Sequence, residues 1–126
     1  MIEIEEAIRE LAVNSRGAEI PKPEAKEPFR IKGMGVRRKQ IALIYTIPSH
    51  SPKQKSYAKG VTFLEFERAY LELIQSGILT RSWFNAELAD CAKEGSCNFT
   101  TIGGIFEMLG AAKYLKRGVY AATSQV

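Results

Sequence analysis

A lone histidine between two serines is the first candidate for chemistry in this 126-residue chain. His50 could act as a base for Ser49 or Ser51, since nucleophilic catalysis pairs a hydroxyl with a nearby base. The three residues lie in a stretch rich in proline and serine, however, and neighbours in such a loop rarely hold catalytic geometry. We therefore interpret His50 as a polar surface group.

Two cysteines are the next candidates. Cys91 and Cys97 are six residues apart and far from His50, so they lack the close ligand spacing of a zinc site. We predict two small, reduced, apolar residues and no metal or cofactor; a disulfide between them would need an oxidising compartment. Cys97 precedes a predicted helix, whose N-terminus can lower a thiol pKa, and is the better candidate for a reactive thiol.

The carboxylates of the second half have structural interpretations. Thr62 and Glu65 have the spacing of a capping box. Glu72 follows Arg68 by four residues, a spacing that allows an ion pair along one helix. Neither pair needs a shifted pKa. Together with the histidine and cysteines they form no catalytic set, so we predict that the chain is not an enzyme.

Basic charge is concentrated in the middle of the sequence. Between Lys22 and Lys59 there are ten basic and two acidic residues, and the run Arg37-Arg38-Lys39 lies at its centre. Such asymmetry indicates an anionic partner, or else a solvated basic face that keeps the protein in solution.

Length and composition define the class of protein. A chain of 126 residues with 45% hydrophobic and 25% charged residues is typical of one globular domain. No apolar run approaches the roughly 20 residues that span a bilayer. Residues 1–6 are acidic where a signal peptide would be basic, so we expect a cytoplasmic protein with no membrane contact.

The first half predicts a helix, an arm and a hairpin. Apolar residues at helical spacing predict a helix over 2–13, and three prolines make the rest of 1–28 an extended arm. Residues 29–32 and 41–47 read as strands of a β-hairpin within 29–48, with Gly33-Met34-Gly35 as its turn. Residues 49–56 read as a loop.

The second half predicts three helices and a second hairpin. The capping box at Thr62 starts a helix that Gly77 ends. After a bridge at 78–80, a second helix runs from a cap at Thr80 or Ser82 to about residue 93. A third, capped by Asn98, Thr100 and Thr101, extends for about ten residues. Residues 113–123 read as a hairpin that turns at 115–118.

This order of elements over 60–123 resembles the winged helix-turn-helix superfamily. The resemblance implies a third helix that lies in the DNA major groove and a hairpin wing that contacts phosphate. The third helix would present Thr100, Thr101, Gly104, Glu107 and Met108, and the wing would present Lys113, Lys116 and Arg117. The helix lacks the Arg, Lys and Gln that most often contact base edges, so binding would depend on the nucleic-acid backbone. Gly103-Gly104 would allow a close approach, either by a ligand or by a packed neighbour.

The sequence thus predicts a single α+β domain: an N-terminal helix, a small β-hairpin and a winged-helix-like C-terminal half. We predict a nucleic-acid-binding protein, a small DNA-binding regulator or accessory factor. The predicted contacts are Arg37, Arg38, Lys39, Asn98, Thr100, Thr101, Gly104, Lys113, Lys116 and Arg117. The alternative is a protein-interaction or assembly module, including a homodimer. Basic residues on one face would favour nucleic acid, whereas scattered basic residues and an apolar patch would favour a protein partner.

Overall fold

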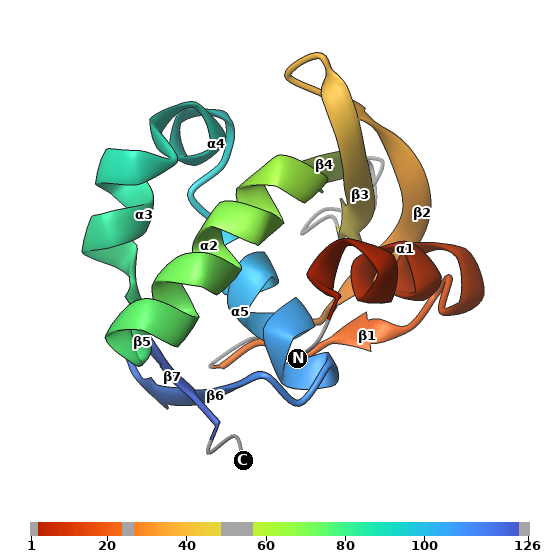
Figure 1. The fold of residues 1–126 in the computed structure, drawn as a ribbon. Coiled ribbons are helices and arrows are strands. Elements are labelled where there is room, and N and C mark those ends of the chain that lie inside the picture. Colours follow the sequence, from red (N-terminus) through yellow and green to blue (C-terminus); the bar gives the residue numbers. More distant parts are fainter. Residues whose placement is uncertain (1–2, 24–26, 49–56, 124–126) are drawn as a thin grey trace.

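Two antiparallel sheets and five helices form the part of the chain that the computed structural model describes, residues 3–23, 27–48 and 57–123 (Figure 1). The first sheet has the order β1 (Glu19–Ile20), β2 (Phe29–Arg37), β3 (Gln40–Ile47), β4 (Tyr57–Thr62). The second has the order β5 (Ile78–Thr80), β7 (Val119–Ala122), β6 (Ala112–Lys116). The helices are α1 (Ile4–Asn14), α2 (Phe63–Ser76), α3 (Arg81–Glu87), α4 (Ala89–Glu94) and α5 (Asn98–Met108). The α+β class is confirmed.

The hairpin of β2 and β3 is longer than the sequence predicts. Its turn is Arg38-Lys39, and the predicted turn at Gly33-Met34-Gly35 is wrong. These three residues continue β2. The register of β2 against β3 shifts between Ile31 and Gly33, and Gly33 has a φ of 148° at this point. A bulge with a glycine keeps a strand in its sheet, so the two glycines alone did not mark a turn.

The helix α1 is confirmed, and two strands were missed. α1 buries Ile4, Ile8 and Ala12 against the sheet and α2, as its spacing predicts. β1 lies in the predicted proline-rich arm and pairs with β2 through Glu19–Arg30 and Ile20–Phe29. β4 pairs with β3 and lies beyond the loop predicted at 49–56, which falls outside the described residues. The arm is therefore a structural part of the first sheet.

The start and end of α2 follow the sequence closely. The Thr62 hydroxyl accepts from the Glu65 amide, and Glu65 accepts from the Thr62 amide, which completes the capping box. Gly77 ends the helix in the left-handed conformation at a φ of 78°. The Arg68–Glu72 pair is wrong, because Arg68 lies 3.6 Å from Glu87 of α3. Glu72 instead accepts from Ser76.

The predicted second helix is two short ones. Of the two predicted caps, Thr80 and Ser82, it is Thr80 that caps α3. Leu88 then leaves the helical conformation, and a new helix, α4, begins at Ala89. The break turns the chain so that the side chains of Leu88 and Cys91 are both buried.

The helix α5 runs through the centre of the fold (Figure 1). Its N-cap is Cys97, which makes no side-chain cap bond, so capping by Asn98, Thr100 and Thr101 is wrong. Side chains all round the helix are buried, including Ile102, Ile105 and Phe106. Such a helix is a core element with little surface of its own. No described helix has the length and apolarity needed to cross a membrane.

Candidate nucleic-acid interface

Arg38 is held inside the fold by ion pairs. Its guanidinium donates to both carboxylate oxygens of Glu65, at 2.7 and 2.6 Å, to Glu94 at 2.7 Å and to the Gly60 carbonyl at 2.9 Å. Burial alone would raise the pKa of Glu65, but the bonds from Arg38 and the Thr62 amide outweigh it, and this pKa is lowered. The Glu65 hydrogen bond outweighs burial for Arg38 as well and raises the pKa of Arg38. Arg38 therefore uses its charge in ion pairs that join the β2–β3 hairpin to α2 and α4.

The other basic residues of the hairpin lie far from the wing. Lys39 is exposed at the tip, and the Arg37 guanidinium donates to the Val36 carbonyl. The tip of β2 and β3 and the hairpin of β6 and β7 project at opposite ends of the molecule (Figure 1). Lys113, Lys116 and Arg117 are exposed on the second of these hairpins. The predicted basic residues thus fall into two separate groups.

Three of the predicted contact residues on α5 are buried. Asn98, Thr101 and Gly104 have no exposed side, so the expectation that α5 presents Thr101 and Gly104 outward is wrong. The Asn98 amide group donates to the Cys91 carbonyl and its oxygen accepts from the Tyr45 hydroxyl. Asn98 is a buried polar link between β3, α4 and α5, because a buried amide needs partners on both sides.

Close packing explains the two adjacent glycines of α5. A Cβ on Gly103 would lie 2.1 Å from the Tyr120 ring, and one on Gly104 would lie 2.3 Å from the Pro21 carbonyl oxygen. Of the two interpretations of Gly103-Gly104, the packed neighbour is the correct one. The arm that precedes β2 covers α5 at Gly104, so this side of the helix cannot enter a groove.

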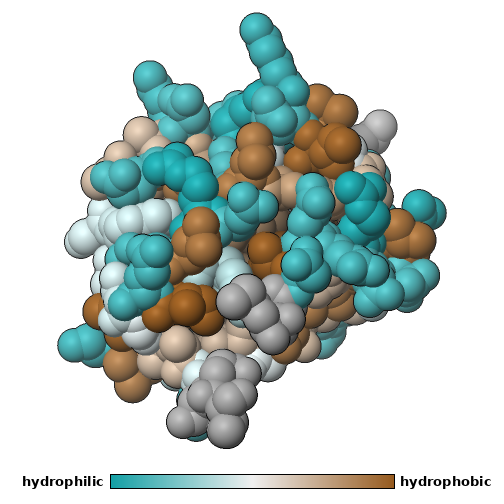
Figure 2. Space-filling model, viewed as in Figure 1, coloured by the Kyte–Doolittle hydropathy of each residue, from teal (hydrophilic) through white to brown (hydrophobic). Residues whose placement is uncertain are grey.

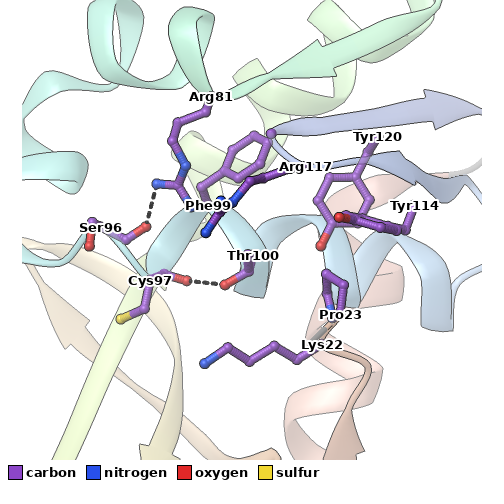
Figure 3. Close-up of a pocket in the computed structure, with 11 residues that line it drawn as sticks. Lys22, Pro23, Arg81, Ser96, Cys97, Phe99, Thr100, Tyr114, Arg117 and Tyr120 are labelled. Atoms are coloured by element: carbon purple, nitrogen blue, oxygen red, sulfur yellow. Dashed lines mark hydrogen bonds between the residues drawn. The ribbon is translucent and has the colours of Figure 1, made fainter. Parts of the chain in front are cut away.

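Thr100, in the first turn of α5, is the predicted contact on this helix that does line a pocket, and Arg117 of the predicted wing lines it too. The pocket has a volume of about 410 Å³ and is hollowed between the arm, the start of α3, the start of α5 and the β6–β7 turn (Figure 3). Its lining residues are Lys22, Pro23, Arg81, Ser96, Cys97, Phe99, Thr100, Tyr114, Arg117, Gly118 and Tyr120. Three of these are cationic and none is acidic, so the pocket has the charge of an anion site.

The cations are positioned by separate elements. Arg81 begins α3, donates to the Ser96 carbonyl at 2.9 Å and stacks over the Phe99 ring at 4.8 Å. Lys22 comes from the arm, and its ammonium lies 3.8 Å from the centre of the Phe29 ring. Arg117 is exposed at the β6–β7 turn. Figure 3 shows all three bordering one hollow beside the N-terminal end of α5, where the helix dipole favours an anion.

Aromatic side chains form the inner wall of the pocket. Tyr114 is half-buried and meets Tyr120 edge-on with ring centres 5.6 Å apart; Tyr120 meets Phe99 in the same way at 5.5 Å. Tyr120 is fully buried, and among the described residues its hydroxyl has no hydrogen-bond partner. Burial above all, and then the charge of Glu107, raises the pKa of Tyr120, so the hydroxyl stays protonated and can donate.

Of the two cysteines, Cys91 is buried and Cys97 is half-buried at the pocket. Cys91 is enclosed and burial, above all, raises the pKa of its thiol. Cys97 lies at the pocket edge, with its sulfur 3.3 Å from the Tyr45 hydroxyl. His50 is outside the described residues. Over residues 3–23, 27–48 and 57–123, no three His, Cys, Asp or Glu side chains gather to hold a metal ion.

Lys22 and Arg81 were missed by the sequence analysis. Lys22 lies in an arm whose course depends on its pairing with β2, which no local pattern reveals. Arg81 did carry a signal: it is a cation in the first turn of a helix, where the macrodipole disfavours positive charge. A residue placed against its local preference is a candidate for another role.

No protein-family model, curated protein or solved structure matches this chain.

Proposed function

We propose that this protein binds nucleic acid, and that it contacts phosphates with the cations around the pocket at the start of α5. The observation that carries the proposal is the convergence of Lys22, Arg81 and Arg117, from three separate elements, on one hollow whose described lining has no carboxylate. Charge-assisted bonds from arginine forks are a usual means of holding phosphate.

The order of elements in the second half supports the proposal. The sequence α2, β5, α3–α4, α5, β6, β7 with β7 central in its sheet is similar to a winged helix, with β6–β7 as the wing. Lys113 and Lys116 would extend the positive surface along that wing. Reading of bases by side chains of α5 is not part of the proposal, since that helix is enclosed. The proposed function is therefore backbone binding with little dependence on base sequence.

The test is fluorescence anisotropy of a labelled oligonucleotide across a salt series. The double variant Arg81→Gln/Arg117→Gln is expected to reduce the slope of log affinity against log salt by about one to two phosphate contacts. The variant Arg37→Gln/Lys39→Gln removes the same charge at the opposite end and is expected to bind like the wild type. Absence of wild-type binding at low salt, or equal losses in the two double variants, would refute the proposal. Thermal melting confirms that each variant is folded.

The predicted basic residues lie in two separate groups and an apolar surface is exposed, which are the two features expected of a protein partner; they favour a second candidate, self-association. Val36 and Ile41 face each other across the β2–β3 hairpin and are 61% and 48% exposed; Met34 on the same strand is 37% exposed. Along α2, Leu64, Leu71 and Ile74 are also exposed. Figure 2 shows hydrophobic surface on this face of the molecule, divided by polar side chains. Exposed apolar residues in such a group are typical of protein interfaces.

If the exposed apolar residues of the β2–β3 hairpin join two copies of the chain, we expect a dimer that a charged substitution at Ile41 disrupts. Sedimentation velocity of the wild type would then show a concentration-dependent dimer, and Ile41→Lys would sediment as a monomer because the lysine would have to be desolvated in the interface. Lys39→Gln, at the adjacent turn, is the control and should remain dimeric. A wild type that stays monomeric at every concentration rules this candidate out.

A further inference from the structure

The pocket leaves the N-terminal turn of α5 open to a ligand. The arm closes the helix at Gly104, where the Pro21 carbonyl and Ile20 side chain occupy the space in which a Cβ would lie. The β6–β7 hairpin closes it at Gly103, against Tyr120. Among the described residues of α5, the side chains that stay partly exposed are Thr100, at the base of the pocket, and Glu107 and Met108 in the last turn. A ligand that reaches the N-terminal turn of α5 must enter the pocket, which a double helix is too wide to do.

The pocket has the size and lining of a site for one small organic anion. Its volume of about 410 Å³ lies within the range of small-molecule sites, which runs from about 300 to 1,000 Å³. It combines cations at the rim with the rings of Tyr114 and Tyr120 on the inner wall (Figure 3). Cations that hold phosphate beside a ring on which a base can stack are typical of sites for unpaired nucleotides.

A buried donor points into this space. The Tyr120 hydroxyl is fully buried, has no partner among the described residues and is directed toward the side of the pocket where Thr100 and Pro23 lie (Figure 3). A buried hydroxyl is normally hydrogen-bonded, and one without a partner destabilises the empty protein. An acceptor on a bound ligand, such as a base carbonyl or ring nitrogen, would complete it.

We infer that the pocket takes a single unpaired nucleotide of a strand, with its phosphate between Arg81, Arg117 and Lys22, its base against Tyr114 and an acceptor on the Tyr120 hydroxyl. This inference rests on the proposed function and narrows it from nucleic acid in general to single strands or unpaired ends.

Fluorescence anisotropy competition on the full chain tests whether the pocket takes an unpaired nucleotide. The three probes are a short single-stranded oligonucleotide, the blunt duplex of the same sequence, and a free mononucleotide, AMP. We expect the single strand to bind at least tenfold more tightly than the duplex. Tyr114→Leu should weaken single-strand binding by about tenfold through the loss of stacking. Tyr57→Leu changes an exposed tyrosine on β4 that does not line the pocket; it is the matched control and should have no effect.

Tyr120→Phe separates binding from folding. Because the variant loses only an unpartnered hydroxyl, the ligand-free protein should melt at or above the wild-type temperature, while single-strand binding weakens by about five- to tenfold. This variant keeps the test valid if Tyr114→Leu proves unfolded. Melting below the wild type would show that the hydroxyl has a structural partner, and it would overturn its role in binding.

The outcomes of the competition distinguish the two proposals. Equal affinity for duplex and single strand, unchanged by Tyr114→Leu, would overturn the pocket inference and leave nucleic-acid binding standing. AMP binding as tight as the oligonucleotide, and sensitive to Tyr114→Leu, would support the nucleotide pocket and exclude a strand as its source. Binding of none of the three probes at low salt would overturn both.

Discussion

Replacing Arg38 by methionine is expected to lower the free energy of unfolding by about 3 kcal/mol. The Arg38 side chain is 13% exposed and its guanidinium makes four hydrogen bonds to Glu65, Glu94 and Gly60. Its removal leaves the Glu65 side chain, which is 14% exposed, without its counter-charge. Loss of one partner from a buried pair is costly because the other charge stays desolvated. Urea unfolding followed by circular dichroism measures the change.

Two further variants serve as comparisons for the loss of stability in Arg38→Met. Arg37→Met makes the same chemical change one residue earlier, where the one bond of the guanidinium to the described residues is to its neighbour's carbonyl, and should cost under about 0.5 kcal/mol. Glu94→Gln should fall between the two, since Glu94 is half-exposed and its pair is partly screened. Equal stability of Arg37→Met and Arg38→Met would contradict a structural role for the ion pairs.

Gly104→Ala is expected to destabilise the protein by about 2 kcal/mol, although alanine is the better helix former. The new methyl would lie 2.3 Å from the Pro21 carbonyl oxygen and 2.6 Å from Ile20, and the first of these contacts is backbone that cannot move without displacing β1. Helix propensity alone would stabilise the variant by about 1 kcal/mol. The sign of the change, read from thermal or urea unfolding, is therefore decisive.

A companion variant shows whether the arm is the cause. Pro21→Gly leaves the carbonyl oxygen in place but frees the backbone that holds it. The double variant should then lose less stability than the sum of the two single changes, because the clash can relax. Strict additivity would show that Gly104 is constrained by something other than this contact.

Local signals predicted those parts of the fold that local chemistry determines. The capping box at Thr62, the left-handed Gly77 and the apolar spacing of α1 depend on residues within a few positions of each other, and all three are confirmed. The hairpin turn was misplaced because Arg38-Lys39 has none of the usual glycine or asparagine, although both residues adopt positive φ, at 48° and 64°. Residues 27 and 56 positions away along the chain hold Arg38 in that conformation.

The sequence likewise predicted only those residues of the candidate site whose position depends on local elements. Arg117 and Thr100 were identified because a wing and a helix start can be placed from the sequence, and the structure brings both to one pocket. Asn98 and Thr101 were misassigned because α5 carries polar residues that face inward, where Asn98 bonds to β3 and α4. Lys22 reaches the pocket only through the pairing of β1, so no window of sequence around it indicates its role.

The path of the arm has a consequence for how the protein unfolds. β1 is hydrogen-bonded into the first sheet, while the residue after it, Pro21, lies against α5, which carries the second sheet. Opening either half therefore disturbs the other, and the two sheets have no boundary along which they could separate as independent folding units. We read the chain as one cooperative unit whose hydrogen-exchange protection should collapse in a single step, and a fragment starting at residue 60 should not fold.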